Sequence, residues 1–113
     1  MSKQKILIID DEIDYSTIMK KYFTDKNYEV FSAFLLKQGL EMIETVQPDI
    51  VFLDNNLPDG KGWTHVEAIV EKNPHLRLYL VSAYHRRGEF VSPSPNVIVW
   101  EKPLSRKLLN ENF

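Results

Sequence analysis

The chain has 113 residues, enough for about one domain, and its 43% hydrophobic and 27% charged residues are typical of a globular protein rather than a disordered one. Fourteen lysine and arginine residues against sixteen aspartate and glutamate residues give a net charge of −2, which offers no support for direct nucleic-acid binding. The absence of cysteine excludes disulfides, thiolate zinc sites and thiol nucleophiles.

The N-terminal segment predicts a strand followed by a helix. Its apolar run begins at Ile6 and is too short for a signal-peptide core or a membrane span, so we expect a cytoplasmic protein without membrane attachment. Residues 5–9 form a continuous apolar run that stops at Asp10, which indicates a strand buried on both faces. Apolar residues three and four apart then predict a helix that ends near Asn27: Tyr15, Ile18, Met19, Tyr22 and Phe23.

The middle of the chain repeats this alternation. Residues 29–32 predict a short strand, and a second helix is predicted by the apolar stripe of Leu36, Leu40, Ile43 and Val46. Residues 50–53 predict a third buried strand that stops at Asp54. Residues 55–62 are rich in turn-forming residues, and a third helix is predicted by Trp63, Val66, Ile69 and Val70.

The C-terminal part predicts two further strands and a short helical tail. The strands are residues 76–81 and 97–100, and the tail has Leu104 and Leu108 on one stripe. Between them, residues 82–97 contain two prolines and almost no apolar period, so we expect the fourth helix to be short or irregular. Strands that alternate with helices predict parallel βαβ units, and hence a single three-layer α/β domain of the (βα)5 type spanning residues 1–113.

Polar residues gather where the predicted strands end. Asp10 and Asp11 close the first strand, Asp54 the third and Ser82 the fourth, and Lys102 follows the fifth. Ligands of open α/β sheets bind beyond these carboxyl ends. If the first and third strands are neighbours, three carboxylates converge, and at ~5 Å and an effective dielectric of about 20 each pair costs roughly 3 kcal/mol. A hard divalent cation such as Mg²⁺ would relieve this repulsion.

A serine hydroxyl and a lysine ammonium beside a metal suit an anion, and phosphate is the obvious candidate. Asp54 would then be the nucleophile that becomes an aspartyl phosphate. Taken singly, Asp10 and Asp11 could merely cap a helix, and Asp54 could merely begin a turn. The joint placement of these residues at four strand ends favours a common site.

The sequence resembles the receiver domains of bacterial two-component response regulators over residues 5–109. The matching motifs are Asp10-Asp11-Glu12, the run from Asp54 through Leu57-Pro58 to Gly62, Ser82-Ala83, and Lys102-Pro103. The resemblance implies a five-stranded parallel sheet in the order 2-1-3-4-5. It also implies a phosphoacceptor switch that assists its own phosphorylation and dephosphorylation, rather than an enzyme acting on other molecules.

The same resemblance implies roles for single residues. Asp11 would bind Mg²⁺ directly and Asp10 through water, Asp54 would ligate the metal and accept the phosphoryl group, and the backbone carbonyl of Asn56 would complete the protein ligands. Ser82 and Lys102 would hold the phosphoryl oxygens, and the peptide bond before Pro103 would be cis. The phosphoryl donor would be a sensor histidine kinase or a histidine phosphotransfer protein, and the sequence identifies neither the output partner nor the oligomeric state.

Two departures from the family lie on the surface that it normally uses for output. Val99 stands where an aromatic residue is usual, with Trp100 next to it, and prolines 93 and 95 replace the usual fourth helix and the turn after it. Ala83, Tyr84, Val99 and Trp100 are therefore the candidate switch and partner residues. An alternative function is a phosphorylation-independent interaction module on the same fold. A stand-alone receiver, a phosphorelay intermediate and a piece of a longer regulator are all compatible with the sequence, whereas a small-molecule phosphatase is less so.

Overall fold

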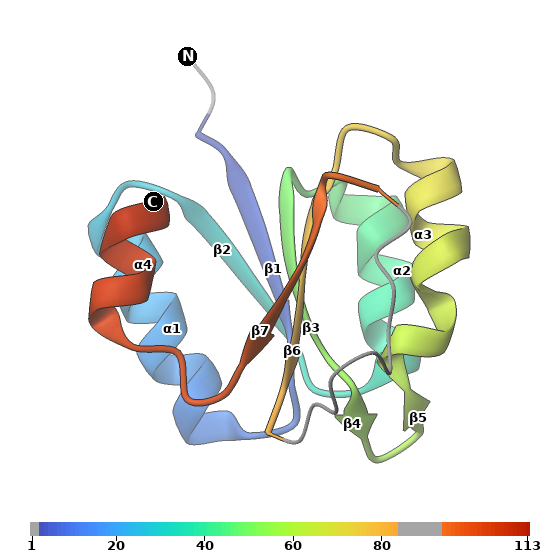
Figure 1. The fold of residues 1–113 in the computed structure, drawn as a ribbon, viewed down its shortest axis with the longest axis horizontal. Helices are drawn as coiled ribbons and strands as arrows, with labels where there is room; N and C mark the ends of the chain where they lie inside the picture. Colours follow the sequence, from blue (N-terminus) through green and yellow to red (C-terminus); the bar gives the residue numbers. More distant parts are fainter. Residues whose placement is uncertain (1–2, 84–93) are drawn as a thin grey trace.

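The computed structural model describes residues 3–83 and 94–113 as an α/β fold built on a five-stranded parallel sheet (Figure 1). Its strands are β1 (Lys5–Ile9), β2 (Glu29–Ala33), β3 (Ile50–Asp54), β6 (Arg77–Ser82) and β7 (Val97–Glu101). Their order is β2-β1-β3-β6-β7. When only these five strands are counted, this is the expected order 2-1-3-4-5, so the predicted fold class and topology are confirmed.

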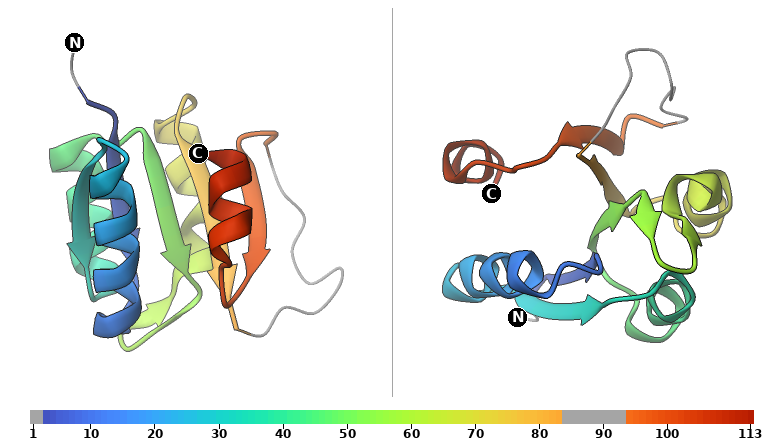
Figure 2. Two further views of the ribbon diagram at one scale, coloured as in Figure 1. Left: turned by 90° about the vertical axis from the view of Figure 1, so that its left-hand side faces the viewer. Right: turned by 90° about the horizontal axis from the view of Figure 1, so that it is seen from below.

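Helices cover both faces of the sheet, which gives the predicted three layers (Figure 2). Helices α1 (Ile13–Asp25) and α4 (Arg106–Asn112) lie on one face, and α2 (Leu36–Val46) and α3 (Val66–Lys72) on the other. A 3-10 turn, η1 (Gly62–His65), leads into α3. In the described ranges no helix has the length and apolar character needed to cross a bilayer. The expectation of a short or irregular fourth helix falls on residues 82–97, of which residues 84–93 lie outside the described residues.

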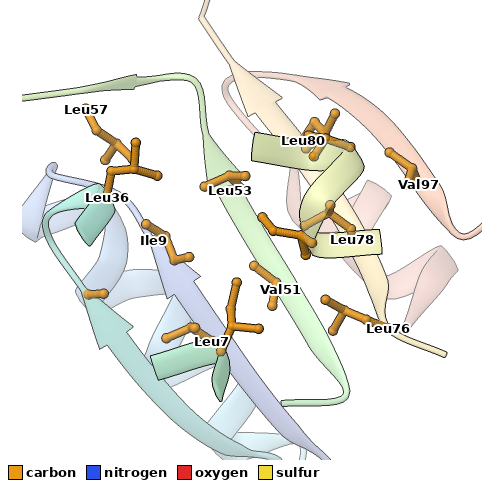
Figure 3. Close-up of a cluster of buried hydrophobic side chains, with 14 residues drawn as sticks. Leu7, Ile9, Leu36, Val51, Leu53, Leu57, Leu76, Leu78, Leu80 and Val97 are labelled. Atoms are coloured by element: carbon orange, nitrogen blue, oxygen red, sulfur yellow. The ribbon is translucent and has the colours of Figure 1, made fainter. Parts of the chain in front are cut away.

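The core consists of two clusters, one on each side of the sheet, because successive strand residues point to opposite faces. One cluster lies under α2 and α3 and includes Leu7, Ile9, Val51, Leu53, Leu78 and Leu80 (Figure 3). The other lies under α1 and α4 and includes Ile6, Ile8, Ile50, Phe52, Tyr79 and Val81. All five residues of β3 are buried. This explains why the central strands are almost continuously apolar and why the run over residues 50–53 predicts a strand correctly.

Two helices meet the sheet with a face that overlaps the predicted apolar stripe but is not identical to it, since Met19 and Phe23 are buried as the stripe predicts. Ile18 is 70% exposed, whereas Ser16 is buried and its hydroxyl donates a hydrogen bond to the backbone carbonyl of Asp10 at 3.4 Å. In α4 the buried residue is Leu109, while Leu108 of the predicted stripe is half-buried. The first turn of α1 packs close to the carbonyl of Asp10, the residue after β1, where a small serine side chain fits and can donate a hydrogen bond.

A small hairpin follows β3 directly. It consists of β4 (Asn56–Leu57) and β5 (Gly60–Lys61), which pair antiparallel at the edge where the parallel strands end (Figure 1). This edge carries Asp10, Asp54 and Ser82, the residues that the sequence analysis singles out. The candidate site is therefore built where the strands finish and the hairpin begins.

Candidate functional site

The three predicted metal-binding carboxylates meet at this edge. Asp10 follows β1 and Asp54 ends β3, and the two strands are paired neighbours with Ile9 opposite Leu53. Asp10 is 2% and Asp54 5% exposed, while Asp11 faces solvent. One carboxylate oxygen from each of the three lies within 4.8 Å of the others. The condition set by the sequence analysis, that the first and third strands be neighbours, is met.

Lys102 is the cation of this cluster. Its Nζ lies 2.7 Å from Oδ2 of Asp10, 3.1 Å from Oε1 of Glu12 and 3.7 Å from Oδ1 of Asp54, and its side chain is 9% exposed. Glu12 contacts the ammonium of Lys102 from the solvent side of the cluster. No role was predicted for Glu12, although its position directly after Asp10 and Asp11 could have indicated that it belongs to the site. This nearly buried ammonium offsets part of the negative charge of the carboxylates around it.

A backbone hydrogen bond between neighbouring strands positions Lys102. Its N–H donates to the carbonyl of Ser82 at 2.9 Å, which ties the end of β7 to the end of β6. The Lys102–Pro103 peptide bond is cis, the isomer that the sequence analysis expects.

Tyr15 is a neighbour of the site that the sequence analysis assigns only to the core. Its ring centroid lies 4.6 Å from Nζ of Lys102, a distance at which a ring attracts a cation. Its hydroxyl is buried and has no hydrogen-bond partner among the described residues. Burial raises the pKa of Tyr15, and the charges of Asp10 and Asp54 raise it further, so the phenol stays protonated. Only tertiary packing brings this ring to Lys102.

The site holds more negative charge than its lysine compensates. Burial raises the pKa of Asp54 from 3.8 to about 6, and the charge of Asp10 adds to the effect. Burial also raises the pKa of Asp10, although the hydrogen bond from Lys102 opposes the change. For Lys102, burial would lower the pKa, but the hydrogen bond and charge of Asp10 outweigh it and the pKa rises. The excess charge calls for a further cation.

The residues at this edge fit a hard divalent cation. They offer carboxylate oxygens from Asp10, Asp11 and Asp54 and no sulfur or imidazole donor within the cluster. Oxygen donors with excess negative charge suit Mg²⁺ or Ca²⁺. The backbone of Asn56, two residues after Asp54, hydrogen-bonds to the Asp54 carboxylate. Its side-chain Oδ1 accepts a hydrogen bond from Nζ of Lys61 at 2.6 Å.

The loop after Asp54 is closed by backbone contacts that need a glycine. The N–H of Gly62 donates to the carbonyl of Asn55 at 3.1 Å, and the N–H of Trp63 donates to Oδ1 of Asn55 at 3.1 Å. A Cβ atom at Gly62 would clash with the backbone oxygen of Asp54. Any side chain there would push the loop away from Asp54, which explains why this motif position is glycine.

The other predicted site residues divide between the edge and the faces of the sheet. Ser82 ends β6 and is fully buried, and Ala83 after it is exposed. Tyr84 lies outside the described residues. Val99 packs against the cluster under α2 and α3, whereas Trp100 packs on the opposite face, with its ring centroid 4.5 Å from that of Tyr79. Trp100 therefore does not take the place of an aromatic residue at position 99.

Comparisons with known proteins match most of the chain. The profile of the response regulator receiver domain family matches residues 6–92. Chemotaxis protein CheY of Listeria monocytogenes is 32% identical over 90 residues, which cover 77% of this chain and 74% of CheY. Regulatory protein VanR of Enterococcus faecium is 35% identical over 71 residues, 63% of this chain but 31% of VanR, so the chain spans less than a third of that relative. A CheY-like response regulator receiver domain protein from Methanospirillum hungatei has a TM-score of 0.80 at 26% identity, covering 97% of this chain and 90% of that structure.

Proposed function

The chain belongs to the response regulator receiver domain family, and from this we propose that it accepts a phosphoryl group on Asp54 in a Mg²⁺-dependent reaction and thereby changes its affinity for a partner. We treat residues 1–113 as one receiver domain. The observation that carries the proposal is the cluster at the edge of the sheet, where the buried Asp54 lies beside Asp10, Asp11 and the ammonium of Lys102.

The chemistry of the donor set supports a bound metal. Asp10, Asp11, Asp54 and the backbone carbonyl of Asn56 would hold Mg²⁺. When bound, the metal would neutralise negative charge on the phosphoryl oxygens. The raised pKa values of Asp10 and Asp54 support this assignment because burial, their main cause, makes an ionised carboxylate costly unless a cation lies beside it.

In the proposed reaction Asp54 is the nucleophile, and Lys102 and Ser82 bind the phosphoryl oxygens. An ionised oxygen of Asp54 attacks phosphorus, and the new O–P bond forms as the P–N bond of a phosphohistidine breaks and the imidazole leaves with the electron pair. A pKa of about 6 keeps Asp54 mostly ionised near neutral pH and makes it more basic than an ordinary aspartate. Lys102 would bind one phosphoryl oxygen through its ammonium, and the Ser82 hydroxyl would donate to another.

We propose a sensor histidine kinase or a histidine phosphotransfer protein as the donor. The second candidate function is a phosphorylation-independent interaction module, and the observation in its favour is Val99. A short β-branched side chain has no ring that could turn between two positions when Ser82 engages a phosphoryl group. If this candidate is right, the domain binds its partner equally well whether or not Asp54 is modified.

Intact-mass measurement after incubation with acetyl phosphate distinguishes the two candidates. With Mg²⁺, wild type should gain the mass of one phosphoryl group, and Asp54→Asn should gain none. Asp49→Asn is the matched control, since this exposed aspartate lies at the other end of β3, and it should be modified like wild type. Chelation of Mg²⁺ should abolish the gain. Wild type that stays unmodified with Mg²⁺ present would favour the second candidate.

A further inference from the structure

Asp59 makes contacts that reach far from its place in the chain. It lies in the turn between β4 and β5, yet its Oδ1 accepts a hydrogen bond from the backbone N–H of Leu36 at 2.7 Å, and its Oδ2 accepts one from that of Lys37 at 2.9 Å. These N–H groups begin α2, whose preceding residue, Leu35, provides no side-chain cap. The hydrogen bonds from Lys37 and Leu36 lower the pKa of Asp59, so the carboxylate is ionised beside the positive end of the helix dipole.

Apolar contacts support the same attachment of the hairpin to α2. Leu57 of β4 is 8% exposed and belongs to the buried cluster that contains Leu36 (Figure 3). Gly60 of β5 has a φ of +155°, and a Cβ atom there would lie 2.9 Å from Cδ2 of Leu36. The hairpin is therefore joined to the start of α2 by one carboxylate, one leucine and one close backbone approach.

The attached hairpin also carries part of the proposed metal site. Asn56 precedes Leu57 in β4 and pairs with Lys61 of β5, and its backbone carbonyl is the proposed fourth protein ligand. Asp59 is three residues further along in the same hairpin, whose two strands are held together by the pairing of Asn56 with Lys61 and of Leu57 with Gly60. Displacement of the hairpin from α2 would displace that carbonyl.

We propose that Asp59 is a positioning residue for Mg²⁺: by capping α2 from the hairpin, it holds the Asn56 carbonyl where it completes the metal site. This inference rests on the proposed function, because it takes Mg²⁺ to be the ligand. Coupling between sites is reciprocal. Mg²⁺ must therefore strengthen the contact between Asp59 and the first turn of α2 to the extent that the contact strengthens Mg²⁺ binding.

Calorimetric titration with Mg²⁺ alone tests the inference. Asp59→Asn places an amide NH2 opposite a backbone N–H, and we expect it to weaken Mg²⁺ binding about tenfold, the low end of the effect of residues that support metal ligands. Asp49→Asn is the matched control, because Oδ2 of Asp49 accepts the backbone N–H of Lys5 at 2.8 Å at the opposite edge of the sheet. It removes the charge of another aspartate that accepts a backbone N–H, and it should leave the affinity unchanged. Equal affinities for wild type and Asp59→Asn would overturn the inference.

Amide hydrogen exchange gives a second measurement that a purely structural role would not change. In wild type, Mg²⁺ should slow exchange of the Leu36 and Lys37 amides more than that of the Lys5 amide. Asp59→Asn should abolish this difference. An identical response of all three amides to Mg²⁺ in wild type would overturn the inference. Wild type that binds no Mg²⁺ would overturn the proposed function and this inference with it, so the two failures are distinguishable.

Discussion

Asp54→Asn should stabilise the metal-free protein, and the gain should depend on pH in a defined way. The carboxylate of Asp54 is 5% exposed and close to Asp10, so its ionised form is less stable in the folded protein than in the unfolded chain. The folded-state pKa of about 6 lies above the ordinary value of 3.8. Asparagine has a similar shape and no charge, and it removes this cost.

The sign and size follow from proton linkage. Below pH 3.8 both folded and unfolded states hold the proton, and Asp54 costs nothing. Between 3.8 and about 6 the unfolded chain ionises first, so wild-type stability falls as pH rises. Above about 6 both states are ionised and the full cost remains. The shift of about two pKa units corresponds to roughly 3 kcal/mol. The difference in free energy of unfolding between Asp54→Asn and wild type should therefore grow by about this amount between pH 4 and pH 7.

Urea unfolding followed by tryptophan fluorescence, with chelator present, measures this difference at each pH. Comparison with wild type at every pH cancels the titration of groups that the two proteins share. Asp25→Asn is a control, because Asp25 lies on the exposed surface of α1 in an ion pair with Lys21. It should change stability by less than about 0.5 kcal/mol at any pH. A difference for Asp54→Asn that stays constant with pH, or that shrinks as pH rises, would mean that the ionised Asp54 carboxylate does not destabilise the folded protein.

The remaining predictions concern the same cluster. Millimolar Mg²⁺ should raise the melting temperature of wild type, because it binds the folded state and offsets the repulsion among carboxylates, and Asp11→Asn should gain less; a melting temperature indifferent to Mg²⁺ speaks against a metal site. Lys102→Ala, measured by urea unfolding without metal, should lose about 3 kcal/mol because Asp10 and Asp54 lose their shared cation; unchanged stability would mean that the pairs contribute nothing. Gly62→Ala should lose about 1–3 kcal/mol because its Cβ would meet the carbonyl of Asp54, and an unaltered urea midpoint would contradict that contact.

The parts of the fold that depend on local pattern could be predicted from the sequence. The run over residues 50–53 indicates a strand buried on both faces, and β3 is buried throughout. Asp10 and Asp54 end two such runs, and parallel strands bring their ends to one edge, so the cluster follows from the topology. The structure adds only the distances between these carboxylates.

Features that depend on how helices pack could not be predicted in this way. The apolar spacing of α1 includes Ile18, but the face that meets the sheet excludes it and includes Ser16. Tyr15 lies over Lys102, which is 87 residues further along the chain. Asp59 caps a helix that begins 23 residues earlier. No local pattern encodes such contacts, because each depends on the distance between elements that only the folded core determines.

Identification of the modified residue shows whether Asp54 is the phosphoacceptor. Protein treated with acetyl phosphate and Mg²⁺ is reduced with borohydride, which converts an aspartyl phosphate to homoserine, and its peptides are then sequenced by mass spectrometry. We expect homoserine in place of Asp54 and at no other position. Homoserine at Asp10 or Asp11, or a phosphoryl group that resists reduction because it is bound to a hydroxyl such as that of Ser82, would contradict it.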